Sequence, residues 1–178
     1  MKPLLFLDLE MNQPSGKIIQ IGYVIIDMDV DQTLCSKRIY VNPNEKLNPT
    51  IETLTGISQA QVDSAPTLEQ AYIELVADVV QHKPFINPVT WGGGDSAELR
   101  KQLCMDDERF VFGRRWIDAK TIYVAYALAN NLPYAGGLFK VMSRFKLGFI
   151  GRAHDALTDA TNTYRLYKHL LTLFKKAL

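Results

Sequence analysis

Two acidic side chains lie near the start of the chain, within the short apolar segment Phe6-Leu7-Asp8-Leu9-Glu10. Such a run is typical of a buried β-strand. Successive side chains of a strand point to opposite faces, so Asp8 and Glu10 share one face. Two carboxylates at that spacing oppose each other's ionisation unless a cation neutralises them, and hard divalent cations prefer oxygen ligands. The pair indicates a metal site; the alternative is two hydrated acids at the end of a strand.

A third acid, Asp95, follows three consecutive glycines, Gly92 to Gly94, and precedes a segment of helical character. Glycine allows backbone geometry and close approach that larger residues forbid. At the start of that helix, Asp95 would project toward the carboxylates of the first strand. The competing interpretation is a helix cap, in which Asp95 and Glu98 form a capping pair worth about 1 kcal/mol.

A histidine and a fourth acid lie where the last helix begins. His154 precedes this helix and Asp159 falls within its early turns, so both side chains can face one cleft. The alternative is that Asp155 caps the helix, Asp159 complements the helix dipole and His154 is a solvated loop residue.

Hydrophobic periodicity predicts the elements that would position these groups. Three strands come first, and their short connections favour an antiparallel meander. A capping-box signal formed by Thr67 and Gln70 then opens a helix, after which strand and helix alternate. The expected strands are Leu4–Leu9, Ile18–Asp27, Thr33–Val41, Phe85–Trp91 and Arg115–Ile117, and the expected helices are Thr67–Gln81, Asp95–Met105, Thr121–Asn130, Gly137–Phe145 and Asp155–Lys175. This order predicts an α/β domain with a mixed sheet flanked by helices.

Length and composition are those of an ordinary globular domain. The chain has 178 residues, of which 47% are hydrophobic and 22% charged, so we expect one domain over residues 1–178. Two cysteines, Cys35 and Cys104, are too few for a disulfide framework, and we expect inert, partly buried thiols in a reducing compartment. With no apolar segment long enough for a signal peptide or a membrane span, we expect a cytoplasmic protein without membrane contact.

Charge is unevenly distributed along the chain. The net charge is +1, which argues against a strongly basic domain that coats nucleic acid, where a pI above about 9 is usual. Residues 140–178 nevertheless carry 8 Lys and Arg against 2 Asp and Glu, whereas residues 1–139 carry 12 against 17. The basic segment is either a solvated helix face or a modest surface for phosphate contacts.

Together these features resemble the motifs of the DEDD 3′–5′ exonuclease superfamily in its histidine variant (DEDDh, DnaQ-like). Asp8 with Glu10, then Asp95, then His154 with Asp159 match the motifs in order and spacing. Within the superfamily the chain looks closest to the Eri-like and KapD-like branch. The resemblance extends to the segments Ile18–Gly22, Leu54–Ser58, Trp91–Asp95, Trp116–Asp118, Gly137–Leu138 and Gly151–His154.

The resemblance implies an RNase H-like fold, a mixed five-stranded sheet whose first three strands are antiparallel. It implies two Mg²⁺ or Mn²⁺ ions per active site: Asp8, Glu10 and Asp159 would hold one, and Asp8 and Asp95 would support the second. His154 would be the general base, because an imidazole ordinarily exchanges its proton near neutral pH. The products would be nucleoside 5′-monophosphates.

Two positions depart from the family pattern. Gln20 stands where Glu is frequent, and Asn12 stands where Thr is frequent. In the family both positions lie near the terminal nucleotide, so substrate detail is affected and the metal ligands are not. Asn12 can still donate and accept hydrogen bonds, and Met11 is either an apolar contact for the terminal base or a packing residue.

We therefore expect a metal-dependent 3′–5′ exonuclease acting on single-stranded DNA or RNA ends, with a homodimer possible. Near-neutral charge fits an enzyme that grips few phosphates, and Arg144, Lys146 and Arg152 are the expected backbone contacts. One alternative is an exonuclease-fold proofreading or binding subunit that depends on a polymerase or ribonucleoprotein. Another is an RNase H-like endonuclease that cuts internally.

Overall fold

The computed structural model describes residues 2–106 and 109–176. Within these ranges the chain alternates from strands to helices much as its periodicity predicts. The elements are β1 (Leu4–Met11), β2 (Ile18–Asp27), β3 (Gln32–Tyr40), α1 (Pro49–Thr55), α2 (Gln59–Asp63), α3 (Leu68–His82), β4 (Val89–Thr90), α4 (Asp95–Leu103), β5 (Ile117–Asp118), α5 (Ala119–Ala129), α6 (Leu138–Arg144) and α7 (Ala156–Lys176).

The strands form one mixed sheet in the order β3-β2-β1-β4-β5. β1, β2 and β3 are antiparallel neighbours, whereas β4 pairs with β1 and β5 pairs with β4 in parallel. The expected RNase H-like α/β fold, with an antiparallel start to a five-stranded sheet, is confirmed. The carboxyl ends of the parallel strands β1 and β4 meet at one edge of the sheet, where Glu10 and the segment before Asp95 lie.

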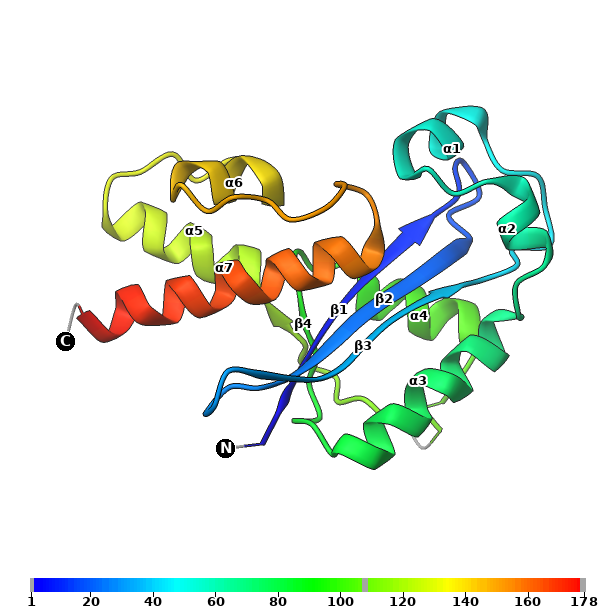
Figure 1. The fold of residues 1–178 in the computed structure, drawn as a ribbon, viewed down its shortest axis with the longest axis horizontal. Helices are drawn as coiled ribbons and strands as arrows, with labels where there is room; N and C mark the ends of the chain where they lie inside the picture. Colours follow the sequence, from blue (N-terminus) through cyan, green and yellow to red (C-terminus); the bar gives the residue numbers. More distant parts are fainter. Residues whose placement is uncertain (1, 107–108, 177–178) are drawn as a thin grey trace.

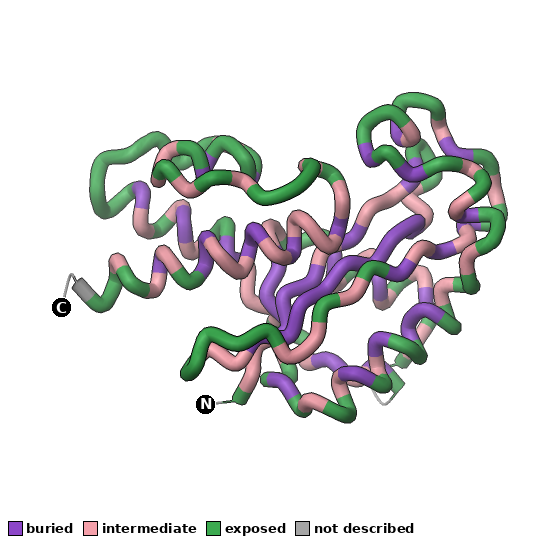
Figure 2. Tube along the Cα trace, viewed as in Figure 1, coloured by how far each residue is buried: buried purple, intermediate pink, exposed green. Residues whose placement is uncertain are grey.

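Helices cover both faces of the sheet (Figure 1). α7 crosses one face over β1 and β2, with α5 and α6 packed beside it, while α3 and α4 cover the other face. Because β2 is central and covered on both sides, every residue in it except Asp27 is buried, as the purple strand in Figure 2 shows. Such two-sided burial explains its nearly continuous run of β-branched and other apolar residues.

Alternation along β1 assigns its side chains to the two faces. Leu5, Leu7 and Leu9 belong to the core cluster on the side of α3 and α4. Phe6 points the other way and packs against Tyr167 of α7. Asp8 and Glu10 follow Phe6 at intervals of two residues, so the sheet presents both carboxylates to α7.

The fourth strand is shorter than its sequence predicts. The expectation was Phe85–Trp91, but only Val89–Thr90 is regular strand. Pro88 has no N–H to donate to a ladder, and the segment before it is held by isolated bonds, from Phe85 N to the Pro3 carbonyl and from Gly113 N to the Ile86 carbonyl. The strand is predicted at the right place but too long, since residues 86–87 and Trp91 are bends.

Two short helices were not expected from periodicity. α1 and α2 have seven and five residues, which is too short for a 3.6-residue apolar pattern to appear. Their caps are visible in the sequence: Asn48 before Pro49 caps α1, and Ser58 forms a capping box with Gln61 in α2. The Thr67–Gln70 box that predicted α3 is confirmed.

Both cysteines lie in the part of the chain that the structure describes. Both thiols are free, and Cys104 is exposed, where partial burial was expected; Cys35 is partly buried. Among the residues that the structure describes, no helix is both long and apolar enough to cross a membrane.

Candidate active site

The first strand carries two of the expected site residues at its carboxyl end. Asp8 lies opposite Gly22 in the register between β1 and β2, so both residues face α7. A Cβ built on Gly22 would lie 2.0 Å from the backbone nitrogen of Leu157 and 2.1 Å from the carbonyl carbon of Ala156. The absence of a side chain at Gly22 therefore lets the first turn of α7 approach the sheet directly beside Asp8.

Three side chains anchor the start of α7 to the sheet. Gln20 of β2 is fully buried; its Oε1 accepts a hydrogen bond of 2.6 Å from the backbone N–H of Ala156, and its Nε2 donates to Asp155 at 3.4 Å. Arg38 of β3 forms an ion pair of 2.7 Å with Asp155. Asp155 also caps α7 by accepting from the Thr158 N–H at 3.0 Å, which confirms the capping role considered for it.

These contacts assign Gln20 and Asp155 to the anchor of α7. Gln20, which the family resemblance places near the terminal nucleotide, is buried and bonded to Ala156 and Asp155; its position relative to a nucleotide stays a prediction. Although burial alone would raise the pKa of Asp155, the hydrogen bonds from Arg38 and Thr158 hold that pKa below its usual range. Asp155 therefore stays ionised as part of the anchor.

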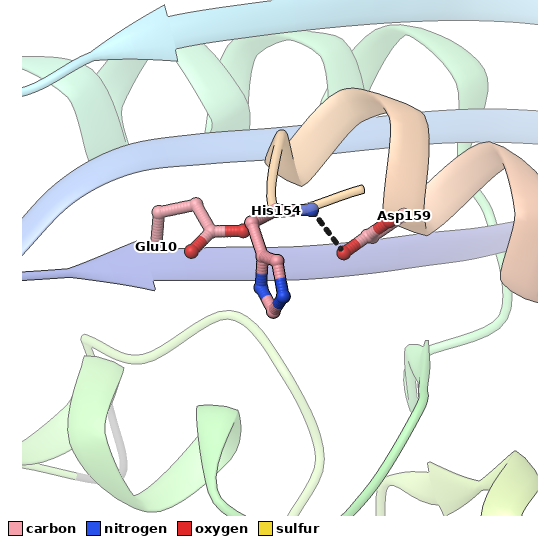
Figure 3. Close-up of side chains that lie close together, drawn as sticks. All are labelled: Glu10, His154 and Asp159. Carbon is pink, nitrogen blue, oxygen red and sulfur yellow. Dashed lines mark hydrogen bonds between the residues drawn. The ribbon is translucent and has the colours of Figure 1, made fainter. Parts of the chain in front are cut away.

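Asp159 lies in the first turn of α7 and faces the carboxylates of β1. Its Oδ2 accepts a hydrogen bond of 3.2 Å from the backbone N–H of His154, drawn as the dashed line in Figure 3. Its Oδ1 is buried and has no hydrogen-bond partner. A buried carboxylate oxygen without a partner is costly, and a bound cation would satisfy it.

His154 completes the group of side chains in Figure 3. The residue is exposed and adopts a left-handed backbone conformation with φ +62°. A ring nitrogen of His154 and carboxylate oxygens of Glu10 and Asp159 all lie within 4.8 Å of one another. The left-handed turn and the tether to Asp159 thus hold an accessible imidazole beside two acids.

Asp95 is the first residue of α4 and is buried, with an exposed fraction of 9%. The capping pair considered as the alternative is not formed, because Gly94 is the cap position and makes no side-chain cap bond. Glu98 instead accepts hydrogen bonds from Lys101 and Gln102. Of the two interpretations, the structure supports an Asp95 that belongs to the acidic cluster.

The pKa values of all four acids are raised in the folded protein. Burial, followed by the charges of Asp95, Glu10 and Asp159, raises the pKa of Asp8 well above its usual range. Burial is also the largest cause at the other three, where the pKa rises to about 8 at Glu10, about 7 at Asp95 and about 6 at Asp159. Neighbouring carboxylates raise the pKa of Glu10 further. The charge of Asp118 raises the pKa of Asp95, and the charge of Asp155 raises the pKa of Asp159. Carboxylates that resist joint ionisation form a donor set suited to hard divalent cations.

The expected substrate contacts differ in how they are held. Asn12 is almost fully buried; its Nδ2 donates to Glu45 and to the Lys46 carbonyl, and its Oδ1 accepts from the Asn48 N–H. Its hydrogen-bonding groups thus position the loop before α1, and a contact with the terminal nucleotide stays a prediction. Met11 is partly buried and packs against the core cluster on the α3 side.

The three basic residues chosen from the sequence differ in their contacts and exposure. Arg144 donates to the Tyr123 hydroxyl at 2.6 Å and to the Pro133 carbonyl at 2.8 Å. Arg152 donates to the Thr53 carbonyl at 2.5 Å and covers Gly56 beside α1. Lys146 is exposed just after α6. Backbone contact by these residues stays a prediction.

A mixed sheet in this order, with acids converging at the carboxyl ends of β1 and β4 and on the crossing helix α7, defines a nuclease domain of RNase H-like fold. The chain belongs to the exonuclease family, whose family model matches residues 5–167. The nuclease domain of 3′hExo, a DEDDh family member solved with rAMP, superposes with a TM-score of 0.81 at 21% identity, covering 96% of this chain and 92% of that chain.

Curated relatives point to the same branch. The probable 3′–5′ exonuclease KapD of Bacillus subtilis is 28% identical over 93% of this chain and 82% of its own length. ERI1 exoribonuclease 3 of Homo sapiens is 29% identical over 80% of this chain, which spans 43% of that relative. The expected Eri-like and KapD-like resemblance is confirmed, and the chain is a 3′–5′ exonuclease by homology.

Proposed function

We propose that this 3′–5′ exonuclease hydrolyses the terminal phosphodiester of single-stranded RNA or DNA with two Mg²⁺ or Mn²⁺ ions and releases nucleoside 5′-monophosphates. The observation that carries the proposal is the convergence of Asp8, Glu10, Asp95 and Asp159, with raised pKa values, beside the accessible imidazole of His154. Four acids gathered in this way have no evident structural purpose without cations.

The acids divide into two overlapping ligand sets. Asp8, Glu10 and Asp159 would hold one ion, with the unpartnered Oδ1 of Asp159 among the donors. Asp8 and Asp95 would support the other from β1 and the start of α4. Two bound divalent ions supply an activated water and stabilise the leaving oxygen of an in-line displacement.

His154 would take the proton of the attacking water. A general base must be accessible and within reach of the water, and His154 is exposed at the rim of the cluster. Its backbone bond to Asp159 ties its position to the ligand set.

The proposal is tested on matched 5′-labelled single-stranded RNA and DNA with Mg²⁺ or Mn²⁺, beside an EDTA control. We expect a ladder that shortens from the 3′ end, is abolished by EDTA and is lost in Asp8→Ala and His154→Ala proteins. The faster substrate identifies the preferred sugar. Cleavage of a circular strand would indicate an endonuclease and contradict the proposal.

Oligomeric state and partner dependence are tested in the same preparation. Gel filtration reports whether the active species is a monomer or a homodimer. Activity of the purified protein alone contradicts the obligate proofreading or binding subunit. A folded, inactive wild-type protein would favour that subunit and overturn our proposal. The single domain over residues 1–178 and the cytoplasmic location stay predictions.

A further inference from the structure

Two segments that are far apart in the sequence meet beside the active site. Residues 54–58 end α1 and lead into α2, and residues 151–154 lead into α7. The guanidinium of Arg152 joins them, because its Nη2 donates to the Thr53 carbonyl at 2.5 Å and to the Leu54 carbonyl at 3.2 Å. These two hydrogen bonds are here called the Arg152 clasp.

The end of α1 supplies the acceptors of the Arg152 clasp. The last carbonyls of a helix have no partner within the helix, and α1 has no basic residue in its last turn. The backbone N–H groups that follow are used elsewhere. The Ile57 N–H donates to the Thr55 hydroxyl at 3.1 Å, and the Ser58 N–H donates to the Gln61 side chain at 2.9 Å. Arg152 supplies donors to two of the helix-end carbonyls in their place.

Gly56 leaves room for the guanidinium. This residue ends α1 in a left-handed conformation with φ +76°. A Cβ built on it would lie 2.1 Å from Nη1 of Arg152 and 2.9 Å from its Cζ. A side chain at this position would therefore displace the guanidinium from the carbonyls. The glycine serves both the left-handed turn and the Arg152 clasp.

The helix that accepts from Arg152 is fixed to the strand that carries Glu10. At the start of α1, the backbone N–H of Asn48 donates to the side chain of Asn12 at 2.9 Å, and Asn12 directly follows β1. Within α1, Ile51 is buried in a core cluster that includes Ile19 of β2. The Arg152 clasp thus attaches the loop before α7 to a packed element that is tied to the end of β1.

The loop before α7 depends on its contacts for its shape. Gly151 and His154 both have left-handed backbone conformations, with φ +78° and +62°. At a residue with a side chain, such a conformation persists only where the surroundings hold it. On the α7 side, the His154 N–H donates to Asp159 at 3.2 Å. On the α1 side, the contact is made by Arg152, so the loop is held from two directions.

We propose that Arg152 is a positioning residue for His154, in which the Arg152 clasp fixes the loop before α7 and keeps the imidazole beside Glu10 and Asp159. This inference rests on the proposed function and deepens it. A ring nitrogen of His154 lies within 4.8 Å of carboxylate oxygens of both acids, and proton transfer by a general base depends on such placement. Arg152 therefore acts on kcat, whereas a contact with the substrate backbone would act on strand binding.

The first test measures kcat and KM on a dinucleotide and on a long single strand with Mg²⁺. In the Arg152→Ala protein we expect kcat to fall about 10- to 100-fold on both substrates, since a displacement of about 1 Å can cost about 10²-fold, while KM stays at the wild-type value. Arg152→Lys keeps a charged donor and should recover part of kcat. Lys140→Ala removes an exposed charge from α6 and should leave both constants unchanged.

A double-mutant cycle with Gly56→Ala separates the Arg152 clasp from a general loss of stability. Gly56→Ala displaces the guanidinium and should lower kcat in the otherwise wild-type protein. In the Arg152→Ala protein the same substitution should lower kcat much less, because no guanidinium remains to be displaced. The cost of the left-handed conformation at residue 56 lowers Tm in both backgrounds. Independent, multiplicative losses of kcat would overturn the inference.

Nuclear magnetic resonance relaxation tests the Arg152 clasp without turnover. In the Arg152→Ala protein the backbone order parameter of His154 should fall from about 0.85 toward about 0.6, while that of Leu166, buried in the middle of α7, stays at the wild-type value. An unchanged order parameter at His154 would overturn the clasp. A fall in the order parameter with wild-type kcat would overturn the positioning role.

A phosphate contact by Arg152 would give a different result. It would raise KM for the long strand at wild-type kcat and lower the slope of log K against log salt by about 0.7, and this outcome would also overturn the inference. Failure of the wild-type protein to cleave either substrate would overturn the proposed function. Because the order parameters test the Arg152 clasp in the same proteins without cleavage, the two failures are distinguishable.

Discussion

Gly22 of β2 lies so close to Leu157 of α7 that a Cβ on the glycine would come within 2.0 Å of the leucine backbone nitrogen. The contact is between two backbones, so neither side can yield by rotating a side chain. It sets the height of α7 above the sheet opposite Asp8, and with it the position at which Asp159 meets the carboxylates of β1.

Replacement of Gly22 by Ala should lower both stability and activity. The added methyl group forces α7 away from the sheet, which lowers the free energy of unfolding by about 1–3 kcal/mol or more. The same displacement moves Asp159 away from Asp8. Urea denaturation and kcat on a labelled strand measure the two effects. Gly148→Ala is the control, since a Cβ there meets no atom within 4 Å; equal behaviour of both variants would contradict this role.

Replacement of Gln20 by Leu should destabilise the start of α7. Leu keeps the approximate size of the side chain but cannot accept from the Ala156 N–H, and a buried unpaired N–H costs about 1–3 kcal/mol. Gln20→Glu retains the acceptor for the Ala156 N–H but places a second negative charge beside Asp155. The free energy of unfolding of this variant should therefore also fall below the wild-type value. Gln81→Leu, at an exposed position of α3, should change little. A Gln20→Leu protein as stable as wild type would contradict the anchor.

The acidic cluster predicts how stability depends on pH in the absence of metal. The pKa values of Glu10, Asp95 and Asp159 are about 8, 7 and 6 in the folded protein and return toward about 4 on unfolding. Between these values the unfolded chain binds fewer protons than the folded chain, so the free energy of unfolding falls as pH rises from about 5 to about 8. Thermal unfolding in EDTA measures this fall.

A variant within the cluster should flatten that pH dependence. Asp159→Asn removes one of the mutually repelling charges, so the metal-free protein should have a higher Tm at about pH 8 than wild type. Glu69→Gln, which removes an exposed acid at the start of α3, should keep the wild-type slope. A Tm that rises with pH in EDTA would show that the cluster is not strained by its own charges.

The ring of His154 has a nitrogen within 4.8 Å of carboxylate oxygens of Glu10 and Asp159, so His154 could act as a base or as a metal ligand, and the two roles can be distinguished. As a general base, His154→Ala should lower kcat by about 10²–10⁴-fold and leave the Mg²⁺-induced rise in Tm intact. Mg²⁺ at about 100 times its Kd should stabilise the wild-type and the His154→Ala proteins alike, by about 2.7 kcal/mol. Asp8→Asn should lose this response together with activity. Loss of the Mg²⁺-induced rise in Tm in the His154→Ala protein would indicate that His154 is a metal ligand.

Local sequence determined much of this protein. Alternation along β1 placed Asp8 and Glu10 on one face, and the Thr67–Gln70 box marked the start of α3, because both depend on residues a few positions apart. The order and spacing of the motifs resemble a family to which the chain belongs over residues 5–167, and they predict five site residues: Asp8, Glu10, Asp95, His154 and Asp159. Periodicity does not predict α1 and α2, which are too short, although their caps Asn48 and Ser58 follow the same local rules.

Only the tertiary structure decided between interpretations that local rules left open. Asp95 joins the acidic cluster and does not cap α4, Gln20 anchors α7, and Asn12 is occupied by the loop before α1. Arg100, Arg114 and Arg115 line one cavity, although the most basic part of the sequence is the segment that contains Arg144 and Arg152. Each outcome depends on a contact between residues distant along the chain, and burial and packing, which set those contacts, follow from the whole fold.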